Sequence, residues 1–440
     1  MSNRSLGRWL ALVVMCALVT IPAVAESHVR IVRLSDVQGP VEVDRGTGQG
    51  YEKAFLNMPV VEGMKLSAKA DARAEIEFED GSTVRVTPNT RIDFTALSLQ
   101  DSGARVSTVT LQQGLAYVDY TAKGKTDVFT FAFHQEKVTP AEAAHFRVEL
   151  QDTHAALAVF KGDLKIDGTP EVPAVSKNKT VMFDFGEGRN YSTIAKNIEE
   201  QPFDAWDKQQ SKYQQEYASR GSYRDYPYAY GVSDLNYYGA YSNVPGYGMM
   251  WQPYFAGANW SPFADGSWMF YPGFGYTWVS SYPWGWMPYR YGSWNFVPGY
   301  GWMWAPGGFG GGWYNVPRVT NAPQRFNPPV APTTGTATVT VGHPGISSGV
   351  PRRMVVQNGS AGLGVPRGAI NNLNKVSNEV QRNGSATVHP AAPVRAASMP
   401  SAPGFGNAGS HVSTGNPGSH MNTGAGRVST GGHTSAPSRH

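Results

Sequence analysis

The sequence predicts a mainly β protein, and two patterns support this fold class. Between residues 26 and 190, short runs in which apolar and polar residues alternate, such as residues 74–78 and 83–86, are separated by Gly, Pro and Asp. A period of two is typical of strands with one buried face and one face in water. Residues 223–314 then repeat a Pro-Gly turn followed by a short aromatic run. The chain has 41% apolar and only 16% charged residues, so neither a wholly disordered chain nor a charged coiled coil fits.

Residues 1–25 are predicted to be a signal peptide. Two arginines precede an apolar run at residues 9–21, and Ala-Val-Ala at residues 23–25 has the small-x-small spacing of a cleavage site. A permanent membrane anchor is the alternative, but this run is shorter than the ~20 residues that a transmembrane helix needs. Cys16, the only cysteine, lies in the run. We therefore expect an exported, cysteine-free mature chain without a transmembrane segment, in the periplasm or at the cell surface.

The alternating region contains four short glycine-containing elements in a characteristic order. A leu-x-x-Gly-x-x-leu-like element lies at residues 60–66, an Asp-Gly-Ser hairpin turn at 80–82, a leu-x-x-Gly element at 111–118 and a val-x-x-Gly-x-leu element at 159–164. Together they resemble the FecR domain, the envelope-side module of bacterial iron-signalling regulators. The resemblance implies a stacked-sheet, solenoid-like β domain over residues 26–190.

The chain departs from the FecR pattern in two places. Ala-Ala-His-Phe-Arg-Val at residues 143–148 stands where the family usually has Gly-Thr-x-Phe-x-Val. The family's regulators also have a cytoplasmic sigma-factor-binding segment and a transmembrane helix before this domain, whereas here only the predicted signal peptide precedes it. Direct contact with a cytoplasmic sigma factor is therefore not expected.

Residues 191–222 are predicted to be a connector that contains one short helix. The helix is expected to begin near Pro202 and to end before Gly221. Its aromatic residues are spaced to lie close to one face: Phe203, Trp206, Tyr213 and Tyr217. Packing of this face against the neighbouring domain is favoured over a groove for a partner.

Residues 223–314 are predicted to be an aromatic β-repeat module. They contain 32 aromatic residues, and the sequence at residues 244–251 returns at 271–278 and at 297–304. Each unit is expected to be a turn followed by a short strand. The module resembles the Trp/Tyr-rich domain of unknown function that often follows FecR-like domains.

The tryptophans of this module are the candidate ligand contacts. Exposed Trp and Tyr rings stack on sugars and are frequent in protein interfaces, whereas buried rings would only fill the core of the module. Because 32 rings are more than a small core should bury, we expect some of them to be exposed. The candidate residues are Trp251, Trp260, Trp268, Trp278, Trp286, Trp294 and Trp304.

Residues 315–440 are predicted to be a disordered, basic tail. Gly, Pro and Ser dominate, no Trp or Tyr occurs, and ten basic residues face one acidic residue, Glu379. Such a segment buries too little apolar area to offset its chain entropy.

No catalytic, cofactor-binding or metal-binding residues are predicted. Gly-x-Ser-x-Gly at residues 345–349 lies in the predicted tail rather than on a strand-turn-helix elbow. Glu75 and Glu77 share one strand face, which is more typical of a solvated edge than of acid–base catalysis. A net charge of +4 is too small to indicate a nucleic-acid partner.

The sequence thus favours a non-enzymatic exported envelope protein that acts as a binding module for an envelope polysaccharide or an envelope protein. The alternative is an envelope-side signalling component related to the FecR regulators of iron-responsive sigma-factor signalling.

Overall fold

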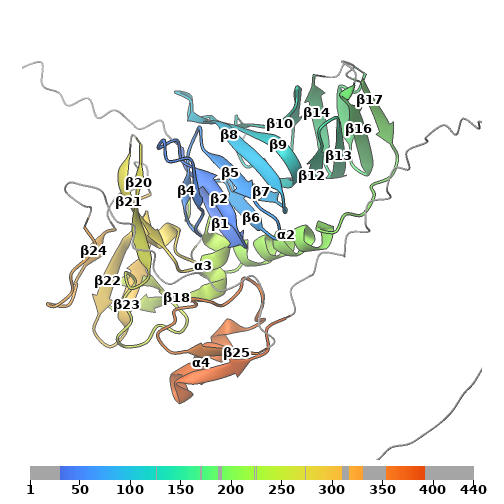
Figure 1. Cartoon of the computed structure of the whole chain (residues 1–440). Coiled ribbons are helices and arrows are strands. Elements are labelled where there is room, and N and C mark those ends of the chain that lie inside the picture. The colour runs from blue at the N-terminus through green and yellow to red at the C-terminus, as the bar shows by residue number, and fades with distance from the viewer. Residues whose placement is uncertain are drawn as a thin grey trace, which may run out of the picture. The chain divides into compact units, whose positions relative to one another are not determined.

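The computed structural model describes residues 30–391 except for residues 125, 169–170, 187–190, 222, 224, 273, 310–316 and 331–352. The predicted signal peptide lies outside this part of the chain. Within it the protein is mainly β, as predicted, and the core is built from strands (Figure 1). The described residues contain three α-helices, where the sequence predicts one: α2 (Asp204–Ala218), α3 (Val232–Tyr238) and α4 (Leu373–Asn383). None of the helices in the described residues is long and apolar enough to cross a membrane.

The first 17 strands form two sheets that share strand β9. Sheet A has the order β3-β2-β5-β8-β9-β10-β11-β14-β15. Sheet B has the order β4-β1-β6-β7-β9-β12-β13-β16-β17. The bounds are β1 Val32–Gln38, β2 Val41–Asp44, β3 Tyr51–Lys53, β4 Pro59–Val60, β5 Lys65–Ala68, β6 Arg73–Glu77, β7 Thr83–Val86, β8 Thr90–Leu99, β9 Arg105–Tyr120, β10 Val128–Phe133, β11 Glu136–Pro140, β12 Ala144–Leu150, β13 His154–Lys161, β14 Asp163–Asp167, β15 Ala174–Ser176, β16 Lys179–Asp184 and β17 Tyr191–Ala195.

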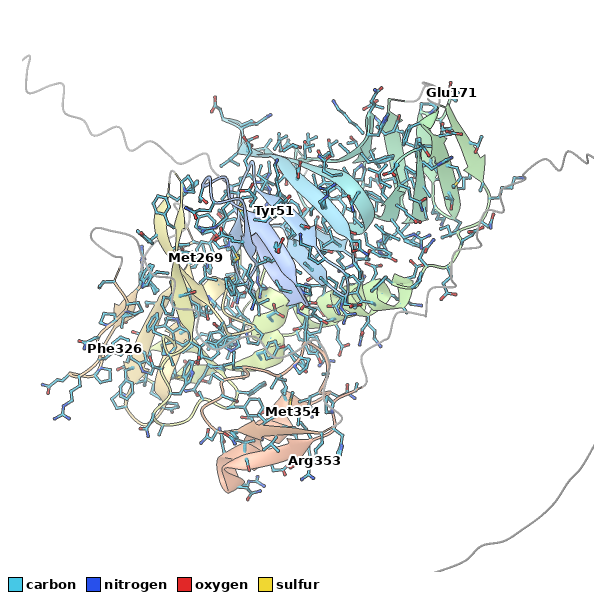
Figure 2. All side chains as sticks on the ribbon, in the orientation of Figure 1. Tyr51, Glu171, Met269, Phe326, Arg353 and Met354 are labelled. Atoms are coloured by element: carbon cyan, nitrogen blue, oxygen red, sulfur yellow. The ribbon has the colours of Figure 1, made fainter. Side chains whose placement is uncertain are left out.

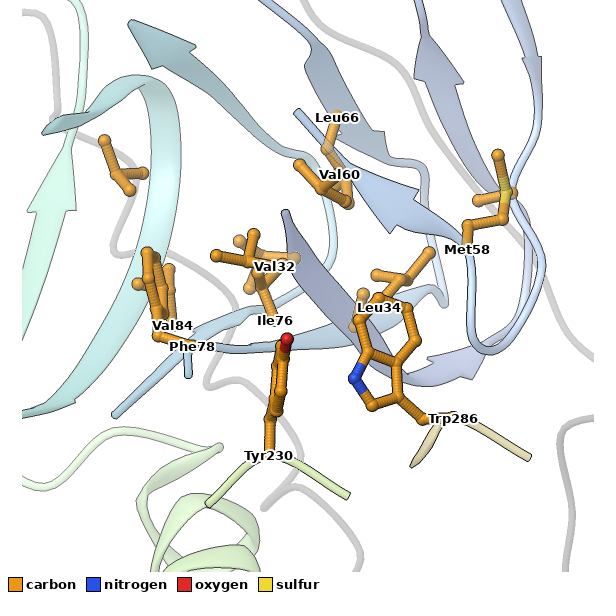
Figure 3. Packing of buried hydrophobic residues seen from close by; sticks show 14 of the residues in the cluster. Val32, Leu34, Met58, Val60, Leu66, Ile76, Phe78, Val84, Tyr230 and Trp286 are labelled. Atoms are coloured by element: carbon orange, nitrogen blue, oxygen red, sulfur yellow. The ribbon is translucent and has the colours of Figure 1, made fainter. Parts of the chain in front are cut away.

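The inner faces of the two sheets share one apolar core. Figure 3 shows Leu66 of sheet A beside Val60 and Val32 of sheet B, and all three side chains are buried. Tyr230 and Trp286, from the aromatic module, pack at the end of the same core. The FecR-like sheets and the aromatic module are therefore continuous in their packing.

Strand β9 changes sheets at a glycine. Its first half pairs with β8 and β10, and its second half pairs with β7 and β12. Gly114, the glycine of the leu-x-x-Gly element, lies at this change with a φ of +92°. A Cβ atom here would lie 2.5 Å from the Thr90 hydroxyl oxygen and 2.9 Å from the Asn89 carbonyl oxygen. This glycine is therefore required both by its backbone angle and by the close approach of a neighbouring turn.

Helix α2 covers the outer face of sheet B. Its position confirms the predicted helix, and Trp206, Tyr213 and Tyr217 are buried as the predicted packing face. Because α2 excludes water from that face, four of the five residues of β6 and all four of β7 are buried. The interpretation of Glu75 and Glu77 as a solvated edge is therefore wrong, since both are at most 1% exposed.

The predicted boundary between the FecR-like domain and the connector also needs correction. The sequence places residues 191–195 in the connector, but they form β17, every residue of which pairs with β16. The strand was missed because the segment is short and lies close to the helical pattern. The connector therefore begins after residue 195.

The aromatic module contains three hairpins that match the three sequence repeats. They are β18 (Gly239–Val244) with β19 (Gly248–Pro253), β20 (Gly266–Tyr271) with β21 (Gly275–Ser280), and β22 (Ser293–Val297) with β23 (Gly301–Ala305). The predicted turn-and-strand unit is confirmed. The first and third hairpins join β24 (Val319–Thr320) in one five-stranded sheet, while the second forms its own two-stranded sheet.

Part of the predicted tail is folded. Strand β25 (Met354–Gln357) pairs with β26 (Ser385–Val388), and α4 lies between them in the chain (Figure 2 labels Met354). The prediction of disorder is therefore wrong for residues 353–391, and also for Val319–Thr320, which form β24. The hydroxyl groups of Tyr237 and Tyr238 donate hydrogen bonds to the carbonyl groups of Ile370 and Val365. Val365 and Ile370 are also buried in the same apolar cluster as these two tyrosines. The apolar surface that orders this segment therefore belongs to the aromatic module, which composition within the segment cannot reveal.

We expect Gly114→Ala to destabilise the protein by about 3 kcal/mol or more, because the strained φ and the clash with residues 89 and 90 add together. Gly103→Ala is the matched control. Gly103 also has a positive φ, +79°, but no atom lies within 4 Å of its Cβ position, so only the backbone cost of about 1–2 kcal/mol applies. Thermal and urea unfolding of both variants would check this, and equal losses would contradict the packing argument.

Candidate functional site at the domain junction

The predicted ligand-contact tryptophans are mostly inside the protein. Only Trp268 is partly exposed. The other six are at most 8% exposed: Trp251, Trp260, Trp278, Trp286, Trp294 and Trp304. The expectation that these rings face a ligand is therefore wrong for six of the seven. Trp260 and Trp294 pack edge to face at 5.8 Å between ring centroids, and the Trp260 indole N–H donates a hydrogen bond to the Tyr282 hydroxyl.

Glycines explain how so many rings fit into one core. In each hairpin unit a tryptophan packs on a glycine that lies 12 residues earlier, and a Cβ atom at that glycine would lie 2.4–2.6 Å from the indole ring. The pairs are Gly239 with Trp251, Gly266 with Trp278, and Gly292 with Trp304. The constant spacing of glycine and tryptophan was present in the sequence and is the signal that could have predicted burial.

A buried ion-pair network joins sheet B to the elements that follow it. Arg85 of β7 pairs with Glu75 of β6 and with Asp207 of α2, each at 2.7 Å. Arg33 of β1 pairs with Glu77 at 3.1 Å and with Asp234 of α3 at 2.6 Å. Sheet B therefore contributes charged groups to both helices.

Arg367, from the segment predicted to be disordered, completes this network. It pairs with Glu75 at 2.7 Å and with Asp234 at 2.9 Å. Its guanidinium group also lies over the Tyr213 ring at 5.1 Å. One arginine thus connects sheet B, α2, α3 and the C-terminal folded segment.

The two glutamates of the network titrate in opposite directions. Burial, reinforced by Asp234 and only partly offset by Arg33, raises the pKa of Glu77 to about 7. Burial alone would also raise the pKa of Glu75, but Arg367 and Arg85 lower that pKa to about 2. Glu75 therefore stays ionised at neutral pH, and Glu77 changes its charge there.

Arg290 is a further buried cation close to the junction. It is 1% exposed, and none of its guanidinium nitrogens has a hydrogen-bond partner among the described residues. The guanidinium group lies over the Trp286 ring at 3.7 Å. Burial lowers the pKa of Arg290 to about 10, so it remains a cation at neutral pH, stabilised by a cation–π contact.

A groove opens beside the network, with a volume of about 410 Å³. One wall comes from the β6–β7 turn and the loop after β9, and includes Asp80 and Lys123. The opposite wall comes from the end of α2 and the segment that follows it, and includes Tyr223, Tyr226 and Tyr228. Its position between two domains and its volume are typical of ligand sites. None of the seven predicted tryptophans lines it.

The groove was missed at the sequence level because its walls are far apart in the chain. The tyrosines at residues 223–228 were counted with the aromatic module, and the Asp-Gly-Ser turn was recognised only as a hairpin. Among the described residues, no group of three or more His, Cys, Asp or Glu side chains is placed to bind a metal ion.

Comparisons with known proteins identify two domains. Residues 64–165 match the FecR protein family, so this part of the chain is a FecR domain. Residues 232–327 match a family of unknown function, DUF6600. The chain therefore contains a FecR domain followed by a DUF6600 domain, as the two resemblances implied. The FecR match covers the centre of the two-sheet body, and the DUF6600 match covers the three hairpins.

Two solved structures of a "putative anti-sigma factor" from Parabacteroides distasonis ATCC 8503 are also similar. The first is 19% identical, with a TM-score of 0.26, and the match covers 32% of this chain and 63% of that one. The second is 16% identical, with a TM-score of 0.27, covering 41% and 94%. These TM-scores are too low for the likeness to bear on function. A comparison with curated proteins gives no match.

We expect Arg367→Met to lower the free energy of unfolding by about 3 kcal/mol, because Glu75 and Asp234 would each lose a buried partner. Hydrogen exchange should also become faster in β25 and β26. Arg382→Met is the control, since Arg382 is exposed on α4. Unchanged exchange in the Arg367 variant would show that this arginine does not fix the C-terminal segment.

We expect the stability of the protein to contain a pH-dependent contribution from Glu77. Because its pKa is raised from 4.5 to about 7, the contribution is fully present below pH 4.5 and is lost as the pH rises through 7. Between pH 5 and 8, Glu77→Gln should therefore lose about 3 kcal/mol less stability than the wild type does. Urea unfolding at several pH values measures this difference. The exposed Glu171 (Figure 2) provides the control, Glu171→Gln, and identical pH profiles for all three proteins would contradict the assignment.

Proposed function

We propose that the protein is a non-enzymatic, envelope-side signalling component in which the FecR domain and the DUF6600 domain act as one body. The observation that carries this proposal is the FecR match at residues 64–165. The burial of six of the seven candidate tryptophans argues against the alternative, a binding module that contacts its ligand through these rings.

Contacts of the two-sheet body with the DUF6600 match, and with the residues just before it, support a coupled body. The Gly231 N–H donates a hydrogen bond to the Glu77 carboxylate at 3.0 Å, and the Ala229 N–H donates one to the Glu79 carbonyl oxygen at 2.7 Å. Arg33 of β1 also donates to the Pro283 carbonyl oxygen of the aromatic module. A partner that displaces the β6–β7 hairpin would therefore disturb groups that the DUF6600 side depends on.

The proposed location is the periplasm or the cell surface, on the strength of the signal-peptide pattern at residues 1–25. In that location the protein would signal through another envelope protein. This fits the alternative that the sequence left open, a component related to FecR regulators of iron-responsive signalling.

The test is to delete the gene for this protein in its native bacterium. Transcripts are compared between deletion and wild-type cells in iron-replete and iron-limited medium. We expect genes controlled by an envelope-responsive sigma factor to change several-fold and to recover when the wild-type gene is restored. No change of such transcripts in either medium would overturn the proposal.

A further inference from the structure

We infer that the groove at the domain junction binds the pyranose rings of a short saccharide. This inference rests on the proposed function, since the saccharide would be the signal that the FecR body receives. It is carried by three properties of the groove: a fixed tyrosine wall, an opposite wall with both donors and acceptors, and a connection to the ion-pair network.

The tyrosine wall is fixed by a second layer of aromatic rings. Tyr226 packs edge to face on Phe309, with ring centroids 5.8 Å apart, and Tyr228 stacks on Tyr291 at 5.5 Å. Tyr223 lies against Tyr226 at 4.7 Å. The three lining rings remain partly exposed. A ligand therefore meets preformed ring faces and does not have to order them, which lowers the entropic cost of binding.

The polar wall presents acceptors and donors side by side. The Asp80 carboxylate accepts hydrogen bonds from the backbone N–H and hydroxyl of Ser82, at 2.9 and 2.8 Å, and has further lone pairs free. Among the described residues, Arg105 donates side-chain hydrogen bonds to Asp127 alone, through Nε and Nη2. The Lys123 ammonium group is exposed and has no ion-pair partner among the described residues.

This combination of groups selects the chemistry of the ligand. Sugar hydroxyl groups both donate and accept hydrogen bonds, so one ring can bond to Asp80 and to Lys123 or Arg105 at once. The apolar C–H face of the same ring can stack on a tyrosine. A purely apolar ligand would take the Lys123 ammonium group out of water without a partner and would leave the remaining hydrogen-bonding capacity of Asp80 and Arg105 unused, at a high cost in free energy.

The β6–β7 hairpin connects the groove to the network. Asp80 lies in the turn of this hairpin, three residues after Glu77, and the neighbouring Glu79 pairs with Arg30 at 2.7 Å. A saccharide that binds Asp80 would therefore contact the same hairpin whose glutamates bind Arg33, Arg85 and Arg367.

The test is isothermal titration calorimetry of the full chain with three probes. Chitotriose represents a neutral amino-sugar polymer, tri-galacturonate represents an acidic polysaccharide, and a proline-rich heptapeptide represents a protein ligand. We expect saturable binding of at least one saccharide. Tighter binding of chitotriose would indicate a neutral amino-sugar ligand, and tighter binding of tri-galacturonate would indicate an acidic polysaccharide.

Four variants locate the binding site. Tyr226→Leu removes a stacking ring and Lys123→Ala removes the unpaired cation, and each should weaken saccharide binding at least tenfold. The controls, Tyr247→Leu and Lys212→Ala, change exposed residues that do not line the groove, and should leave the affinity unchanged. Because Lys123 is exposed, its variant keeps the test decisive even if Tyr226→Leu fails to fold.

Three results would overturn the inference: no saturation by either saccharide at about 10 mM, binding that neither groove variant weakens, or binding of the heptapeptide alone. The transcript measurement separates this inference from the proposed function. If the deletion changes the transcripts but no saccharide binds, only the saccharide inference fails. If a saccharide binds but the deletion changes no transcript, the proposed signalling function fails.

Discussion

The structure depends on a set of carboxylates and arginines that water cannot reach. Glu75 and Glu77 lie between sheet B and the helices that cover it, and their ion-pair partners come from three separate parts of the chain: Arg33, Arg85 and Arg367. Taking such charges out of water is expensive, and the cost is offset only when every partner is in place. The network therefore imposes one arrangement of the FecR sheets, α2, α3 and the C-terminal segment. Any sliding of α2 or α3 along sheet B would leave a buried charge unpaired.

The aromatic module solves a second problem, the construction of a core without disulfide bonds in a small domain. Indole rings are the largest side chains, and glycines on the facing strand let them lie directly on the backbone. Several of the rings also place their N–H groups on carbonyl oxygens, as Trp251 does with Leu235 and Trp304 with Tyr291. The abundance of aromatic residues thus reflects packing between thin hairpins. Their number alone is no evidence of a binding surface.

The candidate site is the groove between the FecR sheets and the segment that leads into the aromatic module. The FecR sheets supply the polar wall, and the start of the downstream region supplies the tyrosine wall. Ligand sites at domain junctions can report binding to both domains, because each wall comes from a different part of the chain. In this protein the hairpin that carries Asp80 also carries the most perturbed glutamates of the junction. The β6–β7 hairpin would therefore both contact the ligand and connect the FecR sheets to the rest of the protein.

The sequence by itself determined the strands, the Asp-Gly-Ser and Pro-Gly hairpins, helix α2 and both domain resemblances, because period and turn chemistry depend on neighbouring residues. Only the tertiary structure decided that Glu75 and Glu77 are buried, that six candidate tryptophans face inward and that residues 353–391 fold. Burial depends on what covers a face, and the cover comes from distant residues. Arg367 reaches Glu75 across 292 positions of the chain, and the groove likewise combines residues 79–123 with residues 218–232. Local patterns hold no information about such pairings.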